Sequence, residues 1–280
     1  YRKKINKIKI FNKNKIQYLK IENQIIIFAC GGVGNPGIIL QPNKNKGIQF
    51  GNESGLVGKY LMDHPHFLYN TLIFKKKLLP HGFNKNENYS AAFVPNINII
   101  NYNKILSHNI YISKDINDYQ YTNDMFTEIL GDELLKGNLG IICEQRPEKN
   151  NCISISKEKN FLNLFKLNIN NKYPKEIISS AKLIFDLFGI YLQKKNLGIL
   201  QNNPEIYTRL KGSGHIMGTT KMGNSIKDSV CDKNCKVHGY ENFFILGSSL
   251  YPRGGSFHPT LLIMALGLRL GDYLKKSLNI

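Results

Sequence analysis

His215 and His258 are the two side chains of this sequence whose surroundings best suit acid–base chemistry. An imidazole has an ordinary pKa of about 6.5, so it can accept a proton and return it near neutral pH. His215 lies in a glycine-rich loop between Gly214 and Gly218, and His258 directly precedes Pro259. A single histidine in such a loop is more often structural than catalytic, so residue type alone leaves both interpretations open.

Two apolar runs that end in small residues predict the strands of a parallel sheet. Residues 25–29 (IIIFA) precede Cys30, Gly31 and Gly32, and residues 243–249 (FFILGSS) end in a glycine and two serines. An apolar run without alternation is typical of a strand that is buried on both faces of such a sheet. The glycines let the backbone turn sharply at the carboxyl end of the strand, where open α/β sheets bind ligands.

Helix-start signals follow both runs. Asn35 and Pro36 predict a short helix through Leu40. After the second run, a glycine-rich loop (YPRGGSF) is followed by the residues His-Pro-Thr and then by an apolar helix over residues 261–274. Proline in the first turn and threonine near the cap are ordinary helix-start residues.

The middle of the chain has a different pattern. Residues 66–211 contain short strand-like stretches, polar loops and one helix over residues 174–188, and residues 152–155 alternate like a half-solvated strand. This pattern favours an antiparallel sheet with a helix on one face. At the N-terminus, residues 8–21 hold two extended stretches around a turn-like cluster, which predicts a β-hairpin.

The composition is that of a globular protein. The chain has 280 residues, of which 42% are apolar, so disorder throughout the chain is excluded. A formal charge of +18 would suit a nucleic acid or an anionic membrane, but only five of the 38 basic residues are arginines and the lysines are scattered. We attribute the charge to A/T-rich codons, and we expect no nucleic-acid partner. The sequence has no apolar run of the roughly 18 to 20 residues that a membrane span needs.

The five cysteines are an odd number in a chain that is too large to need disulfides for stability. A reducing compartment is the simpler expectation, which favours the cytoplasm. Cys231, Cys235 and His238 have a spacing that could suggest zinc, but a structural zinc site usually has four ligands and no fourth is nearby. We therefore expect no metal.

The order of several segments resembles a known family. Residues 215–223 (HIMGTTKMG), 236–252 (KVHGYENFFILGSSLYP) and 257–274 (FHPTLLIMALGLRLGDYL) resemble the C-terminal signature of the glucose-methanol-choline (GMC) oxidoreductases. Upstream, residues 25–40 and 55–65 (GLVGKYLMDHP) are similar to later segments of that family's FAD domain. The short motif EQRP at residues 144–147 is similar to one in the sugar-oxidising branch. The resemblance covers nearly the whole chain in the family's order.

The resemblance implies an α/β plus α+β fold, in which an incomplete, Rossmann-like FAD-binding domain with a parallel sheet carries an inserted antiparallel-sheet substrate domain. Residues 1–65 would be the later part of the FAD-binding domain, 66–212 the substrate-binding domain, and 213–280 the return to the FAD-binding domain. Family members begin with a G-x-G-x-x-G turn that holds the FAD pyrophosphate. The glycine cluster of this chain, with Gly31, Gly32 and Gly34, instead follows residues 25–29, which are similar to a later strand of that domain, so we expect a missing N-terminal FAD-binding segment.

The same resemblance implies an FAD-dependent oxidation of a CH–OH group in a sugar, a polyol or another alcohol. His215 would be the general base and His258 would hydrogen-bond the substrate oxygen, while a hydride passes to N5 of the flavin. The electron acceptor, whether oxygen, a quinone or a cytochrome, stays open. The residues expected to line the cofactor are Gly31, Gly247, Ser248, Pro259 and Thr260.

Other polar residues are interpreted more conservatively. His64 is expected to be structural, and Glu144 and Gln145 either reach substrate or have a structural role at the end of a strand. His238 is expected in a turn. Loop or surface positions are expected for His66, His81 and His108.

Two other functions remain in competition. In the first, the chain is an inert fragment or one half of a split gene, active only with an N-terminal partner that supplies the FAD fingerprint. A basic nucleic-acid-binding module is the remote alternative, and it would require a contiguous lysine-rich face.

Overall fold

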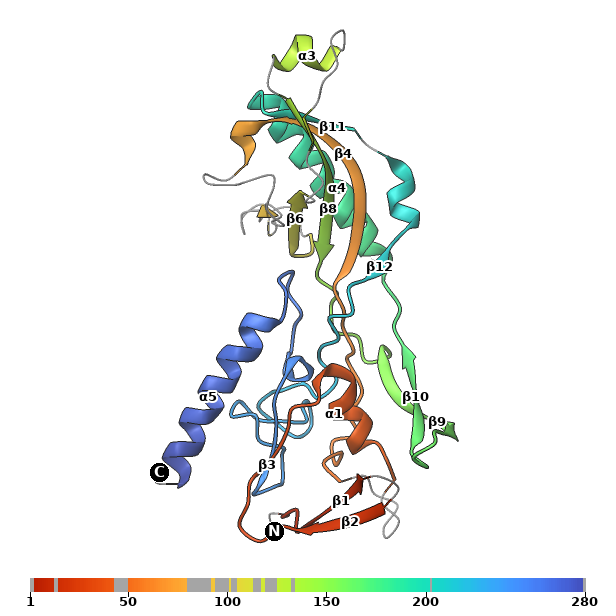
Figure 1. The fold of residues 1–280 in the computed structure, drawn as a ribbon, viewed down its shortest axis with the longest axis vertical. Helices are drawn as coiled ribbons and strands as arrows, with labels where there is room; N and C mark the ends of the chain where they lie inside the picture. The colour runs from red at the N-terminus through yellow and green to blue at the C-terminus, as the bar shows by residue number, and fades with distance from the viewer. Residues whose placement is uncertain are drawn as a thin grey trace.

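The structure is a computed structural model of an elongated molecule in which the long strand β4 links two groups of elements (Figure 1). One group holds the elements near both termini, and the other holds most of a large sheet and helix α4. The residues that the structure describes are 3–12, 15–42, 50–79, 92–93, 101, 105–112, 117–118, 125–131, 134–201 and 203–278.

The predicted N-terminal hairpin is confirmed. Strands β1 (Lys7–Asn12) and β2 (Lys15–Lys20) pair antiparallel over their whole length. Every described side chain of β2 is exposed, so this hairpin lies at the margin of the fold rather than in its core.

The predicted parallel strands are also confirmed, as β3 (Ile26–Phe28) and β13 (Phe243–Ile245). All three residues of β13 are buried, whereas Ile27 in β3 is 42% exposed. The expectation that both strands are buried on both faces is therefore wrong for β3. The reason is that, among the described residues, β13 is its sole partner and one of its faces is not covered.

Helix α1 (Gly31–Ile39) starts directly after β3 and not at Asn35, as the sequence had predicted. Pro36 lies inside the helix, where it has no backbone N–H to donate to the carbonyl of Gly32. That carbonyl instead accepts a hydrogen bond of 2.6 Å from the hydroxyl of Thr219. A distant side chain thus replaces the missing helical bond, which lets the helix begin early.

The middle of the chain forms the predicted antiparallel sheet, with strand order β11-β4-β8-β6-β5 and two short strands, β12 and β7, that pair with β4 and β8. The long strands β4 and β8 lie at its centre. The strands are β4 (Pro65–Lys75), β5 (Ala92–Phe93), β6 (His108–Ile112), β7 (Asn117–Asp118), β8 (Leu134–Cys143), β11 (Gly198–Gln201) and β12 (Lys211–Gly212).

Helix α4 (Lys175–Lys194) covers one face of this sheet, as predicted, but extends six residues beyond the predicted end at position 188. Its apolar stripe includes Ile177, Ala181 and Ile184, which are buried in a core shared with the sheet. The shorter elements near it are η1 (Lys76–Leu78), α3 (Met125–Leu130) and η2 (Pro204–Thr208).

Strands β9 (Cys152–Lys159) and β10 (Phe165–Asn170) form a separate antiparallel pair, which confirms the half-solvated strand predicted at residues 152–155. This pair packs against α1 rather than on the large sheet. Ile153 donates its N–H to the carbonyl of Gly58 at 2.8 Å and belongs to the core around α1. The predicted domain boundaries at 65/66 and 212/213 stay a prediction. The β9–β10 pair lies in the predicted substrate-binding domain but contacts α1, which belongs to the predicted FAD-binding part.

Helix α5 (Thr260–Leu278) follows the loop after β13 and the single turn η3 (Ser248–Leu250). It buries Leu266 and Leu270, but Leu261 and Leu268 are 78% and 74% exposed. The helix therefore presents apolar side chains to solvent. None of the helices in the described part of the chain combines the length and apolar character needed to cross a membrane.

The absence of a side chain at Gly32 is required for contact between α1 and the loop of His215. A Cβ atom there would lie 2.1 Å from the carbonyl oxygen of Ile216, whereas one at Gly271 in α5 would meet nothing within 4 Å. We expect Gly32→Ala to lower the free energy of unfolding by about 1 to 3 kcal/mol. The matched control, Gly271→Ala, should raise it by about 0.5 to 1 kcal/mol. Urea denaturation of both variants tests this, and equal stability would contradict it.

Candidate active site

Two segments that are far apart in the sequence meet at the predicted base. Met62 and Met217 form an antiparallel bridge, with N–H to carbonyl distances of 3.0 and 2.9 Å. The bridge places Asp63 and His64, from the MDHP motif, beside Gly214 and His215. The close approach requires Gly218, because a Cβ there would lie 2.4 Å from the carbonyl oxygen of Tyr60.

Asp63 fixes the backbone of the His215 loop. Its side chain is buried, and Oδ1 accepts the backbone N–H groups of His64 at 2.7 Å and His215 at 2.8 Å. Oδ2 accepts the N–H of Gly214 at 3.2 Å and the hydroxyl of Tyr173 at 3.4 Å. One buried carboxylate therefore joins both segments, and sequence reasoning did not single it out.

His64 is fully buried and lies against the ring of His215. The two Nδ1 atoms are 3.1 Å apart, and Nε2 of His64 lies 3.3 Å from the carbonyl oxygen of Gly254. Burial is the main cause that lowers the pKa of His64 below its ordinary value. The sequence indicated a structural residue. The MDHP motif was the available signal for its position, but not for this contact.

The structure brings His215 and His258 together. Their ring centroids are 4.8 Å apart at an interplanar angle of 55°. His215 is half-buried and His258 is exposed. Burial, followed by the charge of His258, lowers the pKa of His215, and Asp63 partly opposes this effect. The ring of His215 is therefore neutral at neutral pH.

The glycines expected at a cofactor lie at one edge of the parallel pair. Gly31 follows β3 and Gly247 follows β13, and a Cβ on Gly247 would lie 3.8 Å from the Cα atom of Gly31. Asn35 holds this edge together: its Oδ1 accepts the N–H of Cys30 at 2.8 Å, and its Nδ2 donates to the carbonyl of Leu246 at 3.2 Å. Asn35 is fully buried and joins the segments after β3 and β13 through these bonds. It is not the helix start that the sequence suggested.

Ser248 connects this edge to the loop of His215. Its hydroxyl donates to the carbonyl of Ile216 at 2.7 Å, and its own carbonyl accepts the N–H of Gly218 at 3.2 Å. The side chain of Ser248 is therefore already bonded within the protein. The glycine edge and the histidine pair form one continuous region.

Pro259 and Thr260 lie at the N-terminal end of α5, directly after His258. The hydroxyl of Tyr251 donates to the carbonyl of Pro259 at 2.7 Å, which anchors the helix start. The first turn of α5 contains no acidic residue. Its N-terminal amides and the helix dipole therefore favour a negative charge near His258.

Glu144 and Gln145 both make structural bonds. Glu144 is buried and forms a bidentate ion pair with Arg253. Nε of Arg253 donates to Oε1 of Glu144 at 3.0 Å, and a terminal guanidinium nitrogen donates to Oε2 at 3.0 Å. This pair ties the end of β8 to the loop before His258. Gln145 accepts the N–H of Asp63 at 2.8 Å through its side-chain oxygen.

The remaining histidines have varied positions. His66 lies in β4 and its Nδ1 is 3.0 Å from the hydroxyl of Ser213. His108 lies in β6, fully buried, and burial lowers its pKa to about 4. The expectation of loop or surface positions is wrong for these two, because each lies at the start of its strand and strand boundaries are hard to locate from sequence. His238 lies in a turn, as predicted, and His81 is outside the described residues.

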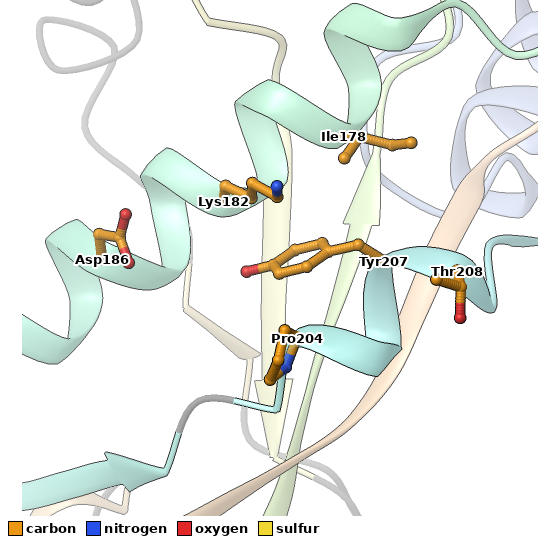
Figure 2. A pocket seen from close by; sticks show the side chains of 6 residues that line it. All are labelled: Ile178, Lys182, Asp186, Pro204, Tyr207 and Thr208. Carbon is orange, nitrogen blue, oxygen red and sulfur yellow. The ribbon is translucent and has the colours of Figure 1, made fainter.

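A surface hollow between α4 and η2 contains none of the predicted site residues. Figure 2 shows the ring of Tyr207 between Lys182 and Pro204, with Ile178, Asp186 and Thr208 around it. The Lys182 Nζ atom lies 5.0 Å from the centroid of that ring, which is a cation–π distance. Elsewhere in the described residues, no group of three or more histidine, cysteine, aspartate or glutamate side chains could hold a metal ion.

Residues 193–267 match the family model of the GMC oxidoreductases. The matched region contains both histidines of the pair. This part of the chain is therefore similar to the C-terminal region of the GMC oxidoreductases.

Similar proteins extend this likeness over almost the whole chain. The 2-methyl-1,2-propanediol dehydrogenase of Mycolicibacterium austroafricanum is 26% identical over 93% of this chain and 49% of its own length. The fructose dehydrogenase large subunit of Gluconobacter japonicus is 34% identical over 24% of this chain and 12% of its own. This chain thus spans about half the length of the first of these relatives.

Solved structures show the same fold. A crystal structure of formate oxidase superposes with a TM-score of 0.61 at 16% identity, covering 93% of this chain and 56% of that one. The pyridoxine 4-oxidase structure gives a TM-score of 0.56 at 13% identity, covering 95% of this chain and 54% of that one. A variant of formate oxidase from Aspergillus oryzae, with a TM-score of 0.61, was solved in work on modification of its FAD.

Proposed function

We propose that this chain is part of an FAD-dependent oxidoreductase that acts on the CH–OH group of a sugar, a polyol or another alcohol. The observation that carries the proposal is the contact between His215 and His258, 4.8 Å apart, next to the edge formed by Gly31 and Gly247. The names of the relatives, which include a diol dehydrogenase and a fructose dehydrogenase, agree with this substrate class.

His215 would act as the general base. The lowered pKa keeps its ring neutral at pH 7, so a ring nitrogen is free to take the hydroxyl proton of the substrate. His258, exposed and adjacent, would donate a hydrogen bond to the same oxygen as negative charge develops there. The electron acceptor for the hydride is FAD when it is bound, because no side chain of this chain can accept one.

The residues at the glycine edge fit such a cofactor. A Cβ atom at Gly31 would meet nothing within 4 Å, so this position is open to a planar group, and the backbone of Gly247 lies beside it. The N-terminal ends of α1 and α5 have no acidic residue in their first turns, which suits an anionic ligand. The backbones of Gly31, Gly247, Pro259 and Thr260 would hold the cofactor, and Ser248 would contribute through its backbone.

Part of the cofactor's surroundings would come from residues beyond these 280. Residues 32–37 (GVGNPG) have the G-x-G-x-x-G spacing and lie in α1, but the chain spans only 49% of the length of the 2-methyl-1,2-propanediol dehydrogenase. Large apolar side chains at Ile27, Leu261 and Leu268 are exposed, and apolar surface of this kind is usually covered by another part of a protein. A second candidate function therefore rests on the same observations: an inert half that becomes active only when a separate chain supplies the phosphate-binding segment.

The lysines give little support to a nucleic-acid-binding module. Several are engaged in ion pairs on different elements, such as Lys3 with Glu53 and Lys166 with Glu158. A further lysine, Lys221, stacks over the ring of Tyr60 at 4.2 Å.

The test is expression of the complete coding sequence that contains these residues. We expect the purified protein to show a flavin absorption spectrum that is bleached by an alcohol or sugar in the absence of oxygen, and to reduce an artificial dye with the same compound. A flavin-free protein that gains activity when a separately encoded chain is added would favour the inert half. A protein that binds flavin but is bleached by no sugar, polyol or simple alcohol would contradict the proposed substrate class.

A further inference from the structure

The contact between His64 and His215 constrains which of their ring nitrogens carry protons. His64 is fully buried, so water does not compete for its ring nitrogens. One of them, Nε2, faces the carbonyl oxygen of Gly254 at 3.3 Å, and the other, Nδ1, faces Nδ1 of His215 at 3.1 Å. Each ring nitrogen of His64 thus has a defined neighbour, and the backbone of Gly255 also interacts with the ring.

A carbonyl oxygen can accept hydrogen bonds but cannot donate them. Nε2 of His64 must therefore carry a proton, since a bare nitrogen would set two lone pairs against each other. A neutral imidazole carries one ring proton, so Nδ1 of His64 is then an acceptor. Burial, which disfavours the charged ring, keeps His64 in this neutral form at neutral pH.

The acceptor on His64 determines the tautomer of His215. A hydrogen bond between the two Nδ1 atoms needs one proton, and His64 has none to give at that position. We infer that His64 holds His215 in the tautomer protonated at Nδ1, which leaves the lone pair on Nε2 of His215 as the atom that takes the substrate's hydroxyl proton. His64 is thus a positioning residue, and the catalytic meaning of this inference rests on the proposed function.

The proton transfer preserves this arrangement. The O–H bond of the substrate breaks, the Nε2–H bond of His215 forms, and the Nδ1–H group of His215 continues to donate to His64. The bond becomes charge-assisted once His215 is an imidazolium, so His64 also stabilises the protonated base. A carboxylate commonly has this orienting role in catalytic triads. Here the carboxylate of Asp63 accepts the backbone N–H groups of His64, Gly214 and His215 instead.

The wild-type protein gives the first test. In protein labelled with ¹⁵N-histidine, long-range ¹H–¹⁵N correlation spectra distinguish a protonated ring nitrogen from a bare one. The resonances of His215 are assigned by their loss in His215→Gln. We expect Nδ1 of His215 to be protonated and Nε2 to be bare at neutral pH without substrate. The opposite pattern would overturn the inference, whatever the variants show.

Two variants separate the acceptor from the rest of the His64 side chain. His64→Asn keeps an oxygen near the position of Nδ1, whereas His64→Gln keeps an N–H donor for Gly254 but puts no acceptor beside His215. We expect His215 to stay protonated at Nδ1 in His64→Asn and to shift toward Nε2 protonation in His64→Gln. Unchanged tautomers in a folded His64→Gln, checked by circular dichroism, would contradict the inference.

Turnover supplies an independent reading. In the flavin-loaded protein, His64→Gln should lower kcat on the order of 10-fold or more with KM changed less than about threefold, and His64→Asn should recover most of it. Equal loss in both variants would indicate a packing role only. If the tautomers behave as expected but no alcohol is oxidised, the proposed function fails while the inference about the ring protons holds.

Discussion

Replacing His215 with alanine in the flavin-loaded protein is expected to lower kcat about 10²- to 10⁴-fold while the flavin content stays unchanged. The hydroxyl proton of the substrate would lose its acceptor, whereas the glycine edge at Gly31 and Gly247 would keep its geometry. Dye reduction with saturating alcohol measures kcat, and the ratio of flavin to protein absorbance measures cofactor content.

A suitable control is His238→Ala, because His238 lies in a turn and bonds the hydroxyl of Ser229 at 2.9 Å. This variant should retain turnover within about threefold of the parent. A His215→Ala protein that also keeps turnover within that range would show that His215 is not the base.

The acid limb of the pH profile belongs to the same prediction. His215 is active when neutral, and burial together with the charge of His258 lowers its pKa below the ordinary value of about 6.5. We therefore expect kcat/KM to be constant as the pH falls to about 6.5 and to decline only as it passes through the lowered pKa. In His215→Ala this limb should disappear. A limb centred above pH 6.5 would contradict the assignment.

Replacing Asp63 with alanine is expected to lower the free energy of unfolding by about 2 to 5 kcal/mol. The change removes a buried acceptor from the backbone N–H groups of His64, Gly214 and His215 and leaves them without their partner. Urea denaturation measures the loss as a lower midpoint at an unchanged slope.

Asp63→Asn should be intermediate in stability, because the amide oxygen can still accept two of these bonds while its NH₂ group faces a donor. The control is Asp228→Ala, since Asp228 is exposed and accepts the N–H of Ser225 at 3.2 Å. That change should cost less than about 1 kcal/mol. Similar midpoints for Asp63→Ala and Asp228→Ala would show that the Asp63 bonds do not hold the loop.

Local patterns in the sequence were sufficient for several of the elements, although the long strands β4 and β8 were not placed individually. The alternation and turn residues of the N-terminal hairpin, the apolar runs of β3 and β13 and the 3.6-residue period of α4 each depend on neighbouring residues. The early start of α1 was missed for the opposite reason. The hydroxyl that satisfies the carbonyl of Gly32 belongs to Thr219, 187 residues away.

The same distinction holds for the site. The sequence by itself determined that His215 and His258 stand in glycine-rich and helix-start surroundings, and that small residues follow two buried-strand runs. Only the tertiary structure decided which side chains contact the base. His64 and Asp63 lie more than 150 positions from His215, and a hydrogen bond across such a separation leaves no periodic pattern in the chain. It arises because folding pairs two segments whose buried polar atoms must satisfy one another.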